Sequence, residues 1–154
     1  MVELFAKAKL PYNYRCRYRS VFIDDEIVSL SAILLNDTYY QLLIENTCKV
    51  ADLAILCAFC LILFKAKAWL DLNHRRNLGQ TIKSGDLRKH KYDVARLTTL
   101  LLDDAKYSIP QNIHNDLHEF INSFKLDPPD MKSLGFEGIT SEDIVELLIK
   151  AYST

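Results

Sequence analysis

Apolar residues recur at helical spacing along the second half of the chain. A run of helix-forming residues begins near Phe59 and ends at Gly79, and we expect it to form the central helix. A turn over residues 83–86 follows, where Ser84 or Asp86 is available as the N-cap of the next helix. The apolar residues of that helix are Leu87, Val94, Leu97 and Leu101, at the spacing of one buried face.

Capping patterns predict two further helices. Residues 108–111 form a capping-box start, and residues 127–129, which include two prolines, end the helix that follows. Thr140 with Asp143 repeats the capping pattern before the last helix. The predicted buried residues are Ile113, Leu117, Phe120, Ile121 and Phe124 in the first of these helices, and Ile144, Leu147, Leu148 and Ala151 in the second.

The first third of the chain mixes short strands and short helices. Strands are predicted at residues 2–6, at the alternating segment 12–23 and at the apolar segment 53–57, which is expected to be buried. Residues 29–35 are predicted to be helical, and Asn36 or Asp37 can cap a second helix that continues through Ile44. The fold class is therefore α+β and mostly helical. We expect a sheet region with short helices over residues 1–57 and a helical region, one compact unit, over 58–154.

Composition narrows the class of protein. The chain has 154 residues, of which 49% are hydrophobic and 25% charged, as expected of a globular domain rather than a disordered one. Its longest uncharged apolar run, residues 53–64, is too short for a membrane span, which needs about 20 residues. The start of the chain lacks the pattern of a signal peptide, and four cysteines without dense spacing are typical of free thiols. We therefore expect a cytoplasmic protein that does not enter a membrane.

Positive charge is concentrated in one segment, although the net charge of the chain is only −1. Residues 65–91 contain eight Lys and Arg residues against two acidic residues, so the segment carries +6 and the remainder −7. Clustered cations can bind nucleotide phosphates or an RNA backbone. The alternative is an ordinary solvated helix face, and composition alone favours it.

Other candidate motifs are weak. Cys57 and Cys60 form a single CxxC within the apolar run, so buried free thiols are favoured over a zinc site. His114 and His118 have the spacing for a shared metal on a helix, but the Glu of a metalloprotease motif is missing. The chain has neither a nucleophile elbow nor a glycine-rich phosphate loop. Trp69 could stack on a base, but its apolar neighbours favour a core position.

Several segments in order resemble a known family. They are VELF at residues 2–5, IDDE at 23–26 leading into SLSAILL at 29–35, FKAKAWLDL at 64–72, and DLRKHKYDV at 86–94 followed by Arg96 and Leu97. Their order and spacing resemble the C-terminal portion of the bacterial AbiEii/AbiGii-toxin-like nucleotidyltransferase family. The resemblance covers nearly the whole chain, and its most specific parts are KAKAWLDL and KHKYDV.

The resemblance implies a mixed sheet with flanking helices followed by a helical C-terminal region. It also implies nucleotidyl transfer from a nucleoside triphosphate to an RNA or other acceptor, with two Mg²⁺ ions held by three carboxylates. Glu3 matches the third carboxylate and is thus the implied metal ligand. Lys65 or Lys67 resembles a lysine that meets triphosphate oxygens, and Asp93 matches an acidic residue that orients it. The alternative for Asp93 is a surface ion pair with Lys89.

The same resemblance assigns catalytic roles to Glu3, Lys65 and Asp93, and the basic segment offers phosphate-binding candidates in Lys67, Arg75, Arg76 and Lys89. The segment that would carry the other two carboxylates precedes Met1 in the family pattern. We therefore expect this chain to be inactive alone and to bind Mg²⁺ only if another chain supplies those carboxylates.

Three interpretations remain open. The first is the C-terminal part of a toxin-type nucleotidyltransferase that works with a complementing N-terminal chain or is countered by an antitoxin. The second is a non-catalytic module that binds RNA, a nucleotide or a protein through residues 65–91. The third is a remnant that associates with itself through an open sheet edge.

Overall fold

The computed structural model describes residues 4–7, 18–21, 30–50, 53–102 and 104–153. The chain is mostly helical and forms two compact units, Met1–Asn46 and Thr47–Thr154. The sequence pattern predicts a boundary between the sheet and helical regions at residue 57, whereas the two units divide after Asn46. The difference arises because the last two strands group with the helices.

The first unit contains a mixed three-stranded sheet. Strands β1 (Leu4–Lys7) and β3 (Leu30–Leu35) are parallel, with Leu4 opposite Ala32, and β2 (Tyr18–Val21) pairs antiparallel with the other edge of β3. The helix predicted over residues 29–35 is therefore wrong, because this segment is the central strand. Periodicity cannot separate a short apolar strand from a short helix, and pairing on both edges decides the outcome here.

Helix α1 (Asp37–Glu45) follows β3 directly and packs on β1 and β3. Its N-cap is Asn36, whose side-chain oxygen accepts a hydrogen bond from the backbone N–H of Tyr39 at 3.0 Å. The predicted cap and helix are confirmed. Tyr39 and Leu42 are the buried residues of α1.

The second unit opens with a β-hairpin of β4 (Thr47–Val50) and β5 (Leu53–Leu56). Strand β5 was predicted but β4 was not, since its alternation covers only four residues. The expected burial of β5 is wrong, because Ile55 is 42% exposed. A two-stranded sheet covers each strand on one edge only, so exposure of this segment is physically reasonable.

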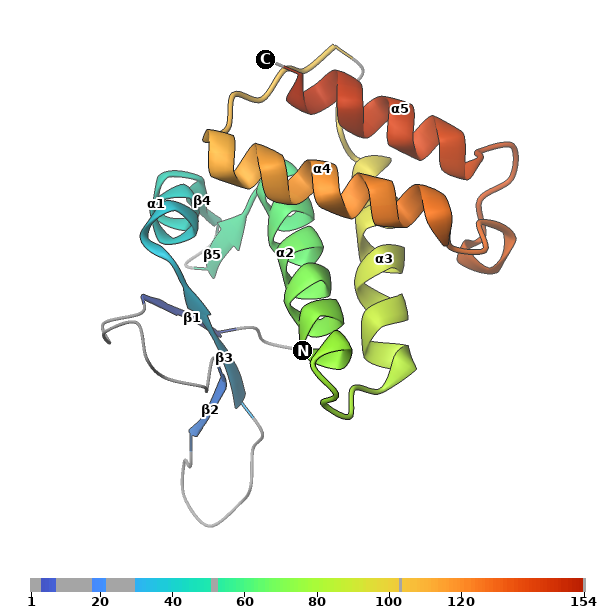
Figure 1. Cartoon of the computed structure of the whole chain (residues 1–154). Helices are drawn as coiled ribbons and strands as arrows, with labels where there is room; N and C mark the ends of the chain where they lie inside the picture. Colours follow the sequence, from blue (N-terminus) through green and yellow to red (C-terminus); the bar gives the residue numbers. More distant parts are fainter. Residues whose placement is uncertain (1–3, 8–17, 22–29, 51–52, 103, 154) are drawn as a thin grey trace. The chain divides into compact units, whose positions relative to one another are not determined.

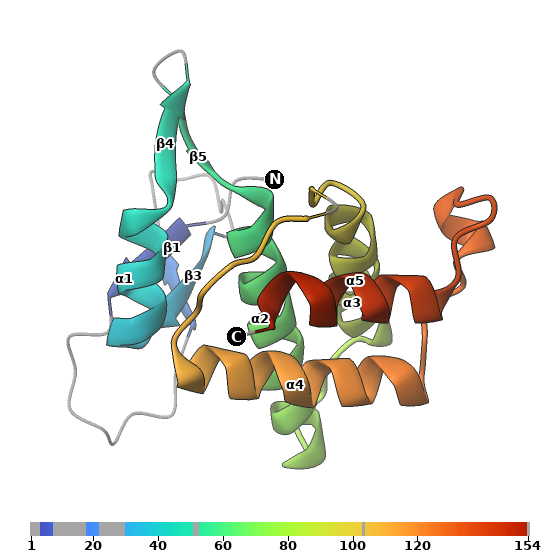
Figure 2. The same cartoon turned by 90° about the horizontal axis from the view of Figure 1, so that it is seen from above.

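Four helices make up the rest of the second unit. They are α2 (Ala58–Asn77), α3 (Ser84–Thr98), α4 (Gln111–Leu126) and α5 (Ser141–Tyr152), with a short 3₁₀ turn, η1, at Lys132–Leu134. Helices α2 and α3 run antiparallel side by side, and α4 and α5 lie across them (Figure 1). Figure 2 shows the same arrangement from above, with α4 beside α5.

The predicted apolar stripes form the core of this helical unit. All five predicted residues of α4 are buried, and so are Ile144, Leu148 and Ala151 of α5, whereas Leu147 is half-buried. The ring of Phe120 meets Trp69 of α2 edge to face at 5.7 Å. The core interpretation of Trp69 is therefore confirmed, since the side chain is buried between α2 and α4.

The observed helix ends match the predicted caps only in part. Thr140 and Asp143 form the predicted capping box of α5, and Gly79 follows α2 with a positive φ of 84°. The predicted caps of α3 and α4 are wrong, because their N-caps are Lys83 and Pro110, which make no side-chain capping bond. Ser84 already lies inside α3, one residue too late to act as its cap.

The end of α5 returns to the start of α2. The hydroxyl of Tyr152 donates a hydrogen bond to the carbonyl oxygen of Phe59 at 2.6 Å. The ring of Phe59 stacks on Tyr107 at 4.3 Å, and the backbone N–H of Tyr107 donates to the carbonyl of Ala151 at 2.8 Å. These contacts join the two ends of the helical unit. None of the helices within the described ranges combines the length and apolar character needed to cross a bilayer.

Candidate functional site

Two of the predicted site residues, Lys65 and Asp93, form an ion pair between α2 and α3. The Lys65 Nζ lies 3.4 Å from the Asp93 Oδ2, and the side chains are 13% and 22% exposed. Antiparallel packing of α2 and α3 brings them together although they are far apart in the sequence. The arrangement is a largely shielded ammonium beside a fixed carboxylate, still reachable from solvent.

The second carboxylate oxygen of Asp93 faces Arg96. Its Oδ1 lies 3.8 Å from the Arg96 guanidinium, three residues further along α3. Asp93 thus divides its charge between a cation on its own helix and one on α2. The contact with Lys65 is the shorter and less exposed of the two, so Lys65 is the main partner of the carboxylate.

The structure does not bring Lys67 to the same place. Its Nζ lies 3.1 Å from Asp116 of α4 and 3.6 Å from Asp71 of α2. Since residues two apart on a helix point in different directions, Lys65 and Lys67 serve different neighbours. Of the two lysines that the sequence offered, Lys65 is the one that pairs with Asp93.

Lys91, which the sequence placed in the basic surface, is a buried structural residue. It is 5% exposed, and its Nζ donates to the carbonyl of Asp127 at 2.6 Å, the Asp127 carboxylate at 2.8 Å and the carbonyl of Ser123 at 3.4 Å. It also lies over the ring of Trp69, 5.0 Å from its centroid. Lys91 therefore holds the end of α4 against α2 and α3, and composition gave no signal of this.

The remaining phosphate-binding candidates lie apart from the ion pair. Arg75 bonds to the side chain of Gln80 at 2.8 Å, and Arg76 bonds to the side chain of Asn73 at 2.9 Å, both near the end of α2. Lys89 is exposed on α3. Arg76 also lines a hollow of about 400 Å³ at this end of the helix pair.

The CxxC cysteines are free and occupy different environments. Cys60 is fully buried, and burial followed by the neighbouring Cys57 raises the pKa of its thiol to about 12. Cys57 is half-buried at the N-cap of α2. A thiol that stays protonated is a poor metal ligand and a poor nucleophile, so Cys60 is part of the core.

The implied metal site cannot be built from the described residues. Glu3 lies outside them, and no group of three His, Cys, Asp or Glu side chains in the described part of the chain is placed to hold an ion. His114 and His118 lie on α4, where His118 approaches Asn122 at 3.3 Å. Binding of Mg²⁺ through Glu3 stays a prediction.

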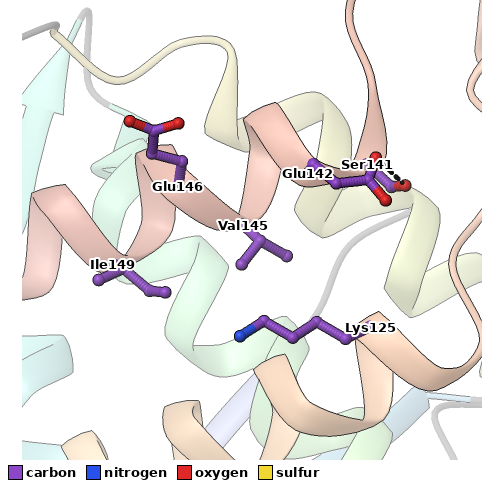
Figure 3. Close-up of a pocket in the computed structure, with 6 residues that line it drawn as sticks. All are labelled: Lys125, Ser141, Glu142, Val145, Glu146 and Ile149. Carbon is purple, nitrogen blue, oxygen red and sulfur yellow. Dashed lines mark hydrogen bonds between the residues drawn. The ribbon is translucent and has the colours of Figure 1, made fainter.

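A further hollow of about 420 Å³ lies between α4 and α5 (Figure 3). Val145 and Ile149 line it together with the side chain of Lys125, and Glu142 and Glu146 border it. Hydrogen bonds from the backbone and from the Ser141 hydroxyl hold the pKa of Glu142 below its usual range. This hollow could not be predicted from the residue pattern, since its lining comes from two helices.

Comparison with known proteins adds no relative. No protein-family model matches the chain, and no curated protein or solved structure matches it either.

Proposed function

We propose that this chain is the C-terminal part of a toxin-type nucleotidyltransferase, in which Lys65 binds the triphosphate of the nucleotide and Asp93 positions Lys65. The observation that carries the proposal is the 3.4 Å ion pair between these residues. The sequence resemblance points to Lys65 or Lys67 on one segment and to Asp93 on another, and the side chains of Lys65 and Asp93 meet. The acceptor is RNA or another molecule with a free hydroxyl group.

The chemistry of the pair supports a role in binding phosphate. An ammonium is a compact point charge that makes strong hydrogen bonds to phosphate oxygens. Shielding at 13% exposure strengthens this attraction relative to a fully solvated lysine, while the remaining exposure leaves a path for the ligand. Asp93 keeps the ammonium in one place, so less side-chain entropy is lost on binding.

A purely structural ion pair between α2 and α3 is the competing explanation. Lys150 and Asp104 form a surface ion pair of the same length, 3.4 Å, which serves as a comparison. That pair is much more exposed, and neither residue carries the family resemblance. A lysine that binds nucleotide and one that only forms a surface ion pair are therefore distinguishable by variants of the two lysines.

The test is equilibrium binding of radiolabelled nucleoside triphosphates to the full chain in the presence of Mg²⁺. Lys65→Ala should weaken binding about ten- to a hundredfold, the worth of a charge-assisted hydrogen bond. Asp93→Asn should weaken it less, and Lys150→Ala should not change it. Equal binding by the wild type and Lys65→Ala would overturn the proposal, whatever the effect on stability.

Catalysis is tested separately. The chain, radiolabelled nucleoside triphosphates, Mg²⁺ and total RNA are incubated together, with Glu3→Ala as the control. We expect no transfer of label by this chain alone. Transfer above the level of the Glu3→Ala variant would contradict that expectation and would identify Glu3 as part of the reaction centre.

A further inference from the structure

The positive charge of residues 65–91 is not spread evenly once the chain is folded. Three of its eight cations, Lys65, Lys67 and Lys91, lie against carboxylates. Among the described residues, Arg76, Lys83 and Arg88 have no carboxylate oxygen within 4.0 Å. All three lie where α2 ends and α3 begins. The unneutralised charge therefore gathers at one end of the helix pair.

A hollow of about 400 Å³ lies at this end, bordered by α2, α3 and the segment that follows α4. Arg76 and Arg88 supply its positive charge, and Ser84 adds a hydroxyl group. Tyr92 and Pro128 supply ring and apolar surface. Because Lys91 binds the carboxylate of Asp127, this acid does not cancel the charge of the two arginines.

We propose that this hollow binds one nucleotide, with its phosphate on Arg76 and Arg88 and its base against Tyr92 and Pro128. Two guanidinium groups offer planar pairs of donors that match phosphate oxygens. Aromatic and apolar side chains accept the flat face of a base. The volume is within the range of small-ligand pockets.

Asp130 adds a polar group that suits the same ligand. Its Oδ1 accepts the backbone N–H of Lys132 at 3.1 Å, which holds the carboxylate in place. Carboxylate oxygens can accept from a ribose hydroxyl or an exocyclic amino group. A simple inorganic anion would gain nothing from Asp130 or from the ring surface, so the lining favours a nucleotide.

This site goes beyond the proposed function and does not depend on it. A helix rises by about 16 Å from residue 65 to residue 76, so one phosphate cannot contact both Lys65 and Arg76. The source of the nucleotide is either a free nucleoside monophosphate or one unit of a single-stranded RNA. Both present the same phosphate and base.

The test uses the full chain and a fluorescently labelled eight-nucleotide single-stranded RNA, titrated at several salt concentrations. The variants are Arg76→Ala with Arg88→Ala, Arg88→Lys, and Lys150→Ala as the control. The double variant should bind at least tenfold more weakly, and its salt dependence should flatten by about one for each lost phosphate contact. Arg88→Lys should bind with intermediate affinity, because it keeps the charge but loses the planar pair of donors.

Competition identifies the source of the ligand. Displacement of the RNA by adenosine monophosphate supports a free nucleotide, and binding of the oligonucleotide alone supports an RNA strand. Tyr92→Leu should weaken either ligand roughly five- to a hundredfold, the range for one stacked base.

Unchanged RNA binding by the double variant would overturn the inference, and so would competition by inorganic phosphate as strong as that by the nucleotide. Arg76 and Arg88 are exposed, so both variants are expected to fold, and melting curves check this. If Lys65→Ala leaves triphosphate binding unchanged also in the Arg76→Ala, Arg88→Ala background, while the arginine variants lose RNA, the proposed function fails and this inference stands.

Discussion

Replacement of Lys91 by Met should destabilise the helical unit by roughly 2–3 kcal/mol. The change leaves the carbonyl oxygen of Asp127 without its 2.6 Å donor, at about 1–1.5 kcal/mol, and removes a longer 3.4 Å bond to the carbonyl of Ser123, at about 0.5 kcal/mol, since that oxygen still accepts from the backbone N–H of Asp127. It also removes the cation over Trp69, worth about 0.5–1 kcal/mol. The methionine fills most of the vacated volume and no longer has a buried charge to desolvate, which limits the loss.

Thermal melting followed by circular dichroism measures this effect. For a domain of about 100 residues the loss corresponds to a fall in Tm of roughly 8–12 °C. Asp127→Ala is the matched variant, because it removes the carboxylate but leaves both backbone carbonyls bound to Lys91. The Asp127 side chain is 88% exposed, but its partner Lys91 is buried and loses its counter-charge, so this change should cost about 1–2 kcal/mol, less than Lys91→Met because the two carbonyls keep the ammonium hydrogen-bonded. Equal losses in the two variants, or no loss in Lys91→Met, would refute the carbonyl argument.

Two further predictions concern ionisation and backbone conformation. Burial raises the pKa of Cys60 to about 12 from 9.0 and also raises that of Tyr152, so the folded chain keeps these protons to higher pH than the unfolded chain. The free energy of unfolding should therefore be level up to about pH 9 and fall above it. Urea melts between about pH 8 and 11 measure this, and Cys60→Ala should delay the fall toward pH 10, where free tyrosine ionises. Gly79→Ala should lower the free energy of unfolding by about 1 kcal/mol, because the φ of Gly79 is 84°. Gly85→Ala should be neutral or slightly stabilising, because Gly85 lies inside α3 with open space at its Cβ position. Equal Tm values of the two variants would contradict this.

The helices were more predictable than the strands, for a physical reason. Helices α4 and α5 bury long stripes with a repeat of three to four residues, and such stripes can be recognised in a single sequence. A strand depends on the segments that pair with its edges, and these can be distant in the chain. The segment Leu30–Leu35 became a strand because both of its edges are paired, and Thr47–Val50 became one through its neighbour Leu53–Leu56.

The candidate site shows a similar division. The resemblance offered Lys65 or Lys67 together with Asp93, and the structure pairs Lys65 with Asp93; their roles in binding nucleotide stay predictions. Lys91 bonds to backbone carbonyls at the end of α4. Every residue has such a carbonyl, so the residue pattern could not predict this role. The charge count for residues 65–91 likewise includes Lys67 as a surface cation, although Asp116 on α4 lies 3.1 Å from its Nζ.

The contact between Tyr152 and Phe59 bears on how the chain is made. During synthesis α2 leaves the ribosome well before the residues that tie down its first turn, because the N-terminal part of a chain emerges first. The nascent helical unit therefore holds α2 with part of its apolar surface uncovered until residue 152 is released. During that interval a chaperone that binds apolar helices can bind α2.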